Sequence, residues 1–79
     1  MQKCLADIIF FHRKRSGLTQ LELAEMADVG KNMVYELENG KQSVQLSNLL
    51  KILRVLNIEL TFQSPLRESF LKEYPEADC

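Results

Sequence analysis

The chain of 79 residues has no tryptophan, one histidine, two cysteines and two prolines. The cysteines lie at opposite ends, at positions 4 and 79, which is a poor basis for a disulfide framework, so we expect reduced, inert thiols. The sequence contains no ligand cluster at metal spacing, no glycine-rich phosphate loop and no nucleophile beside a base. These shortages argue against an enzyme and predict neither a metal nor a cofactor.

Long apolar runs are also missing. No stretch approaches the roughly 20 apolar residues of a membrane span, and the N-terminus lacks a signal-peptide pattern. The composition, 46% apolar and 27% charged, is that of a globular chain, and we expect a cytoplasmic protein. A monomer of this size buries only about 60% of its unfolded surface, so dimerisation is an expected source of further stability.

The net charge of −1 neither supports nor excludes a nucleic-acid partner. Residues 1–63 carry eight basic and seven acidic side chains, whereas residues 64–79 carry two basic and four acidic ones. Local arrangement decides phosphate binding more than the sum does. The basic run Arg13-Lys14-Arg15 leaves two interpretations open: a solvated helix end, where cations suit the helix dipole, or a phosphate contact.

Apolar residues at helical spacing predict amphipathic helices near residues 3–16 and 18–28, a short one within residues 29–40, and one near residues 46–56. Gly17 and Gly40 are typical helix ends. Thr19 and Glu22 have the spacing of a capping box, in which each side chain bonds the other residue's backbone amide. His12 lies on the apolar stripe of the first helix, where we expect a packed imidazole.

The helix within residues 29–40 has the features of a helix that is displayed outward. Val34 and Leu37 lie one turn apart and face inward, while the polar residues between and before them face out. Only a few residues separate this helix from the one before it. That spacing predicts a helix-turn-helix, whose second helix lies in the DNA major groove.

The pattern then changes from helical to alternating. Residues 58–63 alternate apolar and polar side chains, which predicts a strand at 58–62. A lone strand cannot satisfy its own backbone groups, and no other segment has a strand pattern. We therefore expect a homodimer in which the strand pairs with its copy, with three dimerisation residues: Ile58, Leu60 and Phe62. Residues 64–79 form a tail, either disordered or a short helix capped by Ser64 with Pro65 in its first turn.

Over residues 5–62 the sequence resembles the lambda-repressor/Cro-like (XRE-type) helix-turn-helix family. The matching residues are the run GLTQ at 17–20, Leu23-Ala24, Val34, Leu37-Glu38, Gly40-Lys41 and the run LLKI at 49–52. The resemblance implies a compact helical domain that binds operator DNA as a dimer. The expected fold is mainly α, with four helices and one short C-terminal strand at 58–62 pairing across the dimer. That strand, in place of a fifth helix, is similar to HipB-type antitoxins.

The resemblance also implies roles for individual residues. Base contacts are expected from Lys31, Asn32, Met33, Tyr35 and Glu36. Phosphate contacts are expected from Gln20, Asn39, Lys41 and Ser43. A structural ion pair is expected between Arg13 and Glu38, which would remove Arg13 from the DNA contacts.

The sequence therefore predicts a DNA-binding domain at residues 1–63, followed by the tail at 64–79. The expected function is a sequence-specific transcriptional regulator, a dimeric autorepressor of HipB-type antitoxin character. Its expected partners are double-stranded operator DNA, a second copy and, if the antitoxin resemblance holds, a HipA-type kinase toxin. Two alternatives remain open: a protein-interaction module with this fold, and a stand-alone phage-type repressor without a toxin.

Overall fold

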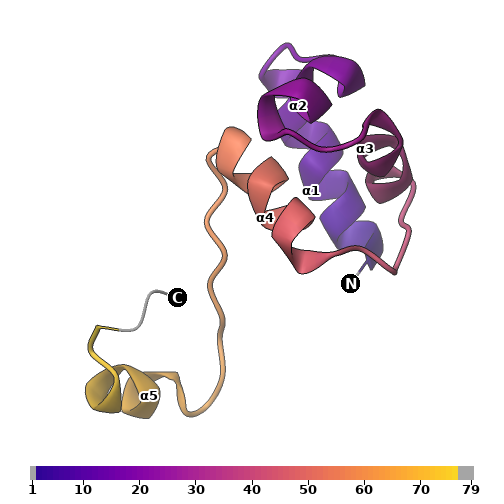
Figure 1. Cartoon of the computed structure of the whole chain (residues 1–79). Helices are drawn as coiled ribbons and strands as arrows, with labels where there is room; N and C mark the ends of the chain where they lie inside the picture. Colours follow the sequence, from indigo (N-terminus) through magenta and orange to yellow (C-terminus); the bar gives the residue numbers. More distant parts are fainter. Residues whose placement is uncertain (1, 77–79) are drawn as a thin grey trace.

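A computed structural model describes residues 2–76 and contains, within that range, five helices and no strand (Figure 1). The helices are α1 (Gln2–Arg15), α2 (Gln20–Ala27), α3 (Lys31–Glu38), α4 (Leu46–Val55) and α5 (Arg67–Glu73). The first four form one compact unit, the four-helix body, and α5 lies apart from it at the end of an extended segment (Figure 1). None of the helices in residues 2–76 is both long enough and apolar enough to span a lipid bilayer.

All four helices of the body end in the same way. A residue with positive φ follows the last turn: Gly17 (73°), Asp28 (59°), Gly40 (86°) and Asn57 (58°). Around each of them two backbone bonds close the helix in the Schellman pattern, for example Gly40 N–H to Leu37 O (3.1 Å) and Lys41 N–H to Glu36 O (3.0 Å). The predicted ends at Gly17 and Gly40 are confirmed. This repeated ending turns the chain sharply and keeps the helices short.

The predicted capping box starts α2 and is confirmed. The Thr19 hydroxyl accepts from the Glu22 amide at 3.0 Å, and the Glu22 carboxylate accepts from the Thr19 amide at 2.8 Å. By contrast, Gly30 precedes α3 without a side-chain cap. Since glycine is only a few tenths of a kcal/mol weaker than the good capping residues, α3 still begins at Lys31.

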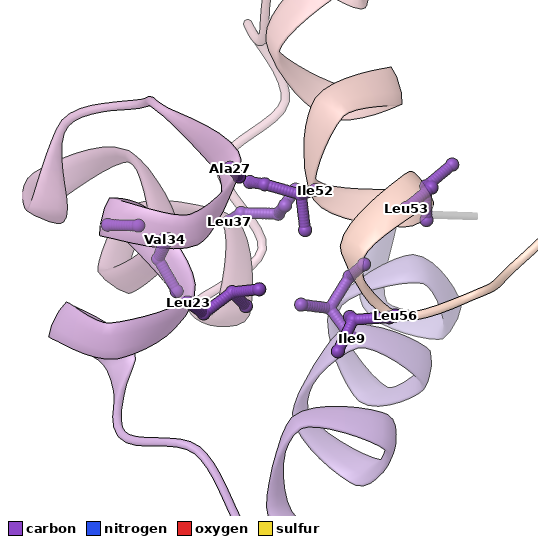
Figure 2. Close-up of a cluster of buried hydrophobic side chains, with 9 residues drawn as sticks. Ile9, Leu23, Ala27, Val34, Leu37, Ile52, Leu53 and Leu56 are labelled. Carbon is purple, nitrogen blue, oxygen red and sulfur yellow. The ribbon is translucent and has the colours of Figure 1, made fainter. Parts of the chain in front are cut away.

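The core of the body lies where α2 packs against α3 and α4 (Figure 2). Val34 and Leu37 of α3 are buried in it, as predicted for the inward face of that helix. The remaining buried members are Ile9, Leu23, Ala24, Ala27, Ile52, Leu53 and Leu56. The small side chains at 24 and 27 leave room for close approach of neighbouring helices. Only one face of α4 is buried, since Leu46 and Leu50 stay exposed.

The segment that follows α4 differs from the prediction. Residues 58–63 form an extended connection between α4 and α5 (Figure 1), and no strand among the described residues pairs with them. A strand is defined by the ladder it forms with a neighbour, and a single copy supplies none. Ile58 packs against the core, whereas Leu60 is 50% exposed. The predicted strand and its pairing across a dimer are therefore not present in one copy alone.

The start of α5 also corrects an expectation. Ser64 does not cap the helix and Pro65 is not in its first turn, because the helix begins at Arg67 with Leu66 before it. The Arg67 amide donates to the Ser64 carbonyl at 3.1 Å, so Pro65 lies in a turn ahead of the helix. Proline suits the second position of such a turn. A short helix in the tail is thus present, and residues 77–79 lie outside the described residues.

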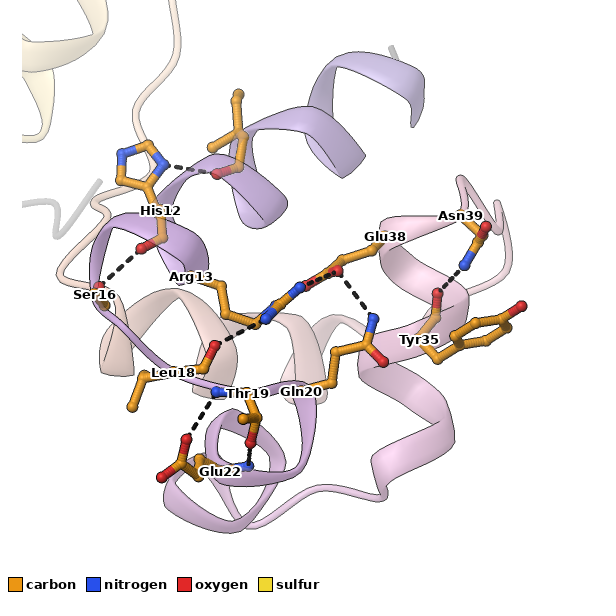
Figure 3. Close-up of polar contacts among 11 residues, drawn as sticks. His12, Arg13, Ser16, Leu18, Thr19, Gln20, Glu22, Tyr35, Glu38 and Asn39 are labelled. Carbon is orange, nitrogen blue, oxygen red and sulfur yellow. Dashed lines mark hydrogen bonds and ion pairs between the residues drawn. The ribbon is translucent and has the colours of Figure 1, made fainter.

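One polar network crosses this apolar body (Figure 3). Arg13 of α1 donates through Nε to Glu38 Oε2 at 2.6 Å and through a terminal nitrogen to Glu38 Oε1 at 3.0 Å. Its other terminal nitrogen donates to the Leu18 carbonyl at 2.8 Å. The side chains are only 8% and 4% exposed. The pair joins α1 and the turn after it to the end of α3.

We predict that Glu38→Ala strongly destabilises the domain. Removing one partner of a buried pair leaves the other charge unpaired, which costs about 3–5 kcal/mol of unfolding free energy. Glu36→Ala is the matched control, because Glu36 pairs with Lys41 at the surface, where such pairs contribute about 1 kcal/mol or less. Urea denaturation followed by circular dichroism measures both. Equal destabilisation by the two substitutions would contradict the structural role of the Arg13–Glu38 pair.

Candidate nucleic-acid interface

The outward face of α3 carries the residues expected to contact bases. Lys31 and Asn32 in its first turn are exposed, and Tyr35 one turn later is 57% exposed. Val34 and Leu37 on the opposite face hold the helix in the core. The N-terminal half of α3 therefore projects polar side chains away from the body, as a helix that enters a groove requires.

Met33 differs from its neighbours on α3. Its side chain is half-buried and packs against the core cluster. A residue in that position has less surface to offer a base pair than Lys31 or Asn32 has. Among the expected base contacts, Met33 is thus the one with a packing role in the free protein.

Two residues with separate expected roles are paired with each other. The Lys41 ammonium donates a hydrogen bond to the Glu36 carboxylate. Lys41 is expected to contact a phosphate, and Glu36 is expected to contact a base. Both side chains remain partly exposed, at 48% and 39%. The pair neutralises the one acidic group on the outward face of α3, which lowers its repulsion of a polyanion. A phosphate that binds Lys41 therefore competes with the Glu36 carboxylate for the same ammonium group.

The turn after α3 brings the remaining expected phosphate contacts together. Asn39 donates through Nδ2 to the Tyr35 carbonyl at 2.7 Å, which fixes its side chain at the helix end. Lys41 and Ser43 line one hollow at this end of α3. The hollow is also lined by Met33, Glu36, Val44, Gln45 and Asn48.

Gln20 lies at the other end of the interface and belongs to the polar network. Its Nε2 donates to Glu38 Oε1 at 3.0 Å, so Glu38 receives bonds from both Arg13 and Gln20 (Figure 3). An amide NH2 group has two hydrogens, which leaves the second one and the carbonyl oxygen for another partner. The buried ion pair therefore orients the residue expected on the DNA backbone.

The structure adds two cations that the sequence did not connect with Gln20. A hollow of about 560 Å³ lies between the turn after α1 and the start of α3, and Lys14 and Lys31 both line it beside Gln20. The first amides of α2 lie at the same place. The Thr19 hydroxyl accepts from the Glu22 amide, which leaves the amides of Gln20 and Leu21 without an acceptor within the helix. Two lysines and a helix N-terminus favour an anion such as phosphate.

The three consecutive cations Arg13, Lys14 and Arg15 thus have three different surroundings. Arg13 is tied to Glu38, Lys14 lines the hollow beside Gln20, and the Arg15 guanidinium lies 4.6 Å from the centre of the Phe11 ring. Helical geometry separates neighbouring residues by about 100°, which explains the divergence. In the sequence, Lys14 is indicated only as a member of this basic run, for which a phosphate contact is one of two interpretations.

His12 and Cys4 lie on α1, outside the two helices of the helix-turn-helix. His12 is half-buried, its Nδ1 lies 2.7 Å from the Ile8 carbonyl, and its ring meets Phe11 edge to face. No group of three or more potential metal ligands occurs among the described residues. Cys4 is exposed on α1, and Cys79 lies outside the described range.

Comparison with known proteins agrees with this geometry. The family described as Helix-turn-helix (HTH_3) matches residues 12–63, which is more than half of the chain. The chain belongs to this helix-turn-helix family, and the XRE-type resemblance seen in the sequence is confirmed. The family is one of DNA-binding regulators, which are generally not enzymes.

Individual relatives are similar over most of their length. An uncharacterized HTH-type transcriptional regulator of Sinorhizobium fredii, y4mF, is 36% identical over 53 residues, covering 67% of this chain and 70% of that protein. Two solved structures, described as "MDT Protein" and "Structure of HipA-HipB-O2-O3 complex", each superpose with a TM-score of 0.74 at 26% identity. Each covers 82% of this chain and 92% of the other.

Proposed function

We propose that this protein is a dimeric, sequence-specific DNA-binding repressor of HipB-type antitoxin character. The observation that carries the proposal is the exposed N-terminal half of α3, held by Val34 and Leu37 and flanked at both ends by cation-lined hollows. Membership of the helix-turn-helix family supports the same function.

In this proposal the two ends of the interface bind phosphates and α3 reads the bases between them. Lys31 and Asn32 are the proposed base readers, since lysine donates to guanine acceptors and asparagine can pair bidentately with adenine. Tyr35, Glu36 and Met33 are proposed neighbours of the next base pairs. Phosphates bind Gln20 at one end, and Asn39, Lys41 and Ser43 at the other.

The net charge of −1 does not oppose this assignment, because the acidic groups are unevenly placed. Glu38 is enclosed by Arg13 and Gln20, and Glu36 is paired with Lys41. Lys14 and Lys31 remain exposed beside the start of α2. Pairing of these two carboxylates thus reduces the charge repulsion of DNA at the proposed interface.

The dimer in this proposal is built by residues 58–62. These residues are extended, and Leu60 exposes half of its side chain in a single copy. Antiparallel pairing with the same segment of a second copy would satisfy their backbone groups and place Ile58, Leu60 and Phe62 on one face. That apolar face then lies over the α4 helices of both copies, where Leu46 and Leu50 are exposed.

The antitoxin character draws its support from one solved structure. That structure is described as a HipA-HipB-O2-O3 complex, and it covers 82% of this chain. By analogy, we propose a HipA-type kinase as a second partner and repression of the chain's own operon as the regulatory output. A kinase-like reading frame beside the gene would support this assignment, and its absence would favour a stand-alone phage-type repressor.

Selection of bound duplexes from a random library tests the central part of the proposal. Asn32→Ala is expected to relax the selected preference at one base position in each half-site, by about 1–3 kcal/mol of discrimination. Gln20→Ala is expected to weaken every duplex alike, because a phosphate contact carries no base information. Mobility shifts on the selected operator and its single-base variants provide the measurement.

Two results of that selection would contradict the proposal. Identical specificity profiles for Asn32→Ala and Gln20→Ala would show that the assignment of readers and phosphate contacts is wrong. A wild-type protein that enriches no sequence at any salt concentration would favour a protein-interaction module instead.

Proline substitutions test the dimer. Inward-pointing amides alternate along a strand, so at least one of Leu60→Pro and Thr61→Pro removes a ladder hydrogen bond. We expect that variant to sediment largely as a monomer and to bind a palindromic operator far more weakly. Gln63→Pro, beyond the proposed ladder, is the control and is expected to remain dimeric. If both Leu60→Pro and Thr61→Pro remained dimeric, the dimer interface would lie outside residues 58–62.

A further inference from the structure

Helix α5 carries an apolar stripe that lies away from the four-helix body (Figure 1). Phe70 stacks on Tyr74 with ring centres 5.1 Å apart and meets Phe62 edge to face at 5.5 Å. Leu66, one turn before Phe70, is 70% exposed. No residue of α5 is buried, and the extended segment holds the helix away from the four-helix body (Figure 1). A helix this short is not stable alone in water, so its stripe requires a packing surface.

Helix α1 carries a second exposed apolar surface. Ile8 and Phe11 are 37% and 51% exposed, and they line a shallow hollow with Cys4, Asp7 and His12. These residues repeat at spacings of three and four, so they form one face of α1. Ile9 of the same helix is fully buried in the core. The Ile8–Phe11 face is therefore an exposed outer surface of the body.

The proposed strand pairing brings these two surfaces together. In an antiparallel pair centred on Leu60, residue 62 of one copy lies beside residue 58 of the other. Ile58 packs on the core, and Leu56 just before it belongs to the same buried cluster as Ile9 of α1 (Figure 2). The five residues of the strand span roughly 17 Å, so α5, which follows the strand, lies at a distance from α1 of the same copy. The strand pairing therefore places α5 of each copy near α1 of the other copy.

The charges of the two segments are complementary. Residues 64–79 carry four acidic and two basic side chains. The C-terminal turn of α1 carries Lys14 and Arg15, both exposed, while the charge of Arg13 is already paired. Helix α5 itself carries two basic and two acidic side chains, so the excess of acid in the tail lies beyond it, in residues 74–79. This acidic end of the tail meets cations rather than carboxylates if it reaches the end of α1.

We infer that the protein forms an arm-exchanged dimer, in which α5 of each copy packs its Phe70–Tyr74 stripe against Ile8 and Phe11 of the other. The inference rests on the dimer part of the proposed function. It also explains how so short a strand pair persists, since two strands without a packed face are marginal in water. The exchange adds two helix–helix contacts to the five-residue ladder.

Substitutions on the two surfaces test the arm exchange. Phe70→Glu and Phe11→Glu are each expected to raise the dimer dissociation constant tenfold or more in sedimentation of the full chain. Lys72→Gln changes the charge by the same one unit on the polar side of α5 and is the matched control, with an unchanged constant. Both phenylalanines lie outside the buried core, so circular dichroism should show a folded body in each variant. Unchanged dimerisation in Phe70→Glu would overturn the inference.

Cross-linking distinguishes exchange from other positions of α5. In Cys79→Ser/Tyr74→Cys, native Cys4 lies on the α1 face and the new thiol on the α5 stripe. A short bismaleimide is applied to a mixture of ¹⁵N-labelled and unlabelled copies. Exchange predicts a link between position 4 and position 74 that joins labelled to unlabelled peptides. Cys79→Ser alone and Cys4→Ser/Cys79→Ser/Tyr74→Cys identify links between identical positions.

The remaining outcomes each overturn the inference. A link between positions 4 and 74 only within single copies would place α5 on its own α1. No such link in a protein that still sediments as a dimer and binds its selected operator would leave α5 free for a different protein, with the proposed function intact. A monomer without sequence preference would instead remove the proposed function together with the arm exchange.

Discussion

The Arg13–Glu38 ion pair determines where α3 stands relative to the rest of the domain. A body of this size buries few large side chains, and apolar packing alone does not specify how a short helix is oriented along its neighbours. The paired guanidinium and carboxylate are directional, and Arg13 also bonds the Leu18 carbonyl. Because Glu38 accepts from Gln20 as well, the same carboxylate sets the relative position of α2's first turn and of α3.

This arrangement separates the structural residues of the interface from those that face a ligand. The inward face of α3 is held in the body by Val34, Leu37 and Glu38. Its outward face exposes Lys31, Asn32 and Tyr35. Lys31, Asn32 and Tyr35 can therefore change without loss of the fold, whereas Gln20 and Met33 also have structural contacts. Of the two ion pairs at α3, the surface one between Glu36 and Lys41 is the one that a phosphate can rearrange at low cost.

Much of the body could be predicted from the sequence because its signals are local. Helical spacing located α1 to α4, and the Thr19–Glu22 box and the glycines at 17 and 40 marked ends that the structure contains. The Arg13–Glu38 pair followed only from the family resemblance, since no local rule links residues 25 positions apart.

The parts that escaped prediction depend on contacts between distant segments. The Glu36–Lys41 pair and the convergence of Lys14 and Lys31 on one hollow require the folded arrangement of α1, α2 and α3. Alternation at 58–62 predicted extended backbone, which the chain has, but a paired strand depends on a second copy. The position of α5 away from the body has the same origin, because its apolar stripe meets nearby rings such as Phe62 and not the four-helix body (Figure 1).

A dimer that reads successive major grooves must hold its two α3 helices one turn of DNA apart, and we propose that the two copies do so. Double electron–electron resonance on the DNA-free protein measures this separation most directly, with a nitroxide at Asn32→Cys in a Cys4→Ser/Cys79→Ser background. The account predicts a distance distribution centred at about 34 Å, the spacing of successive major grooves on one face of B-DNA. A dimer whose distribution has no population near that distance, or a protein with no intermolecular distance at all, would contradict it.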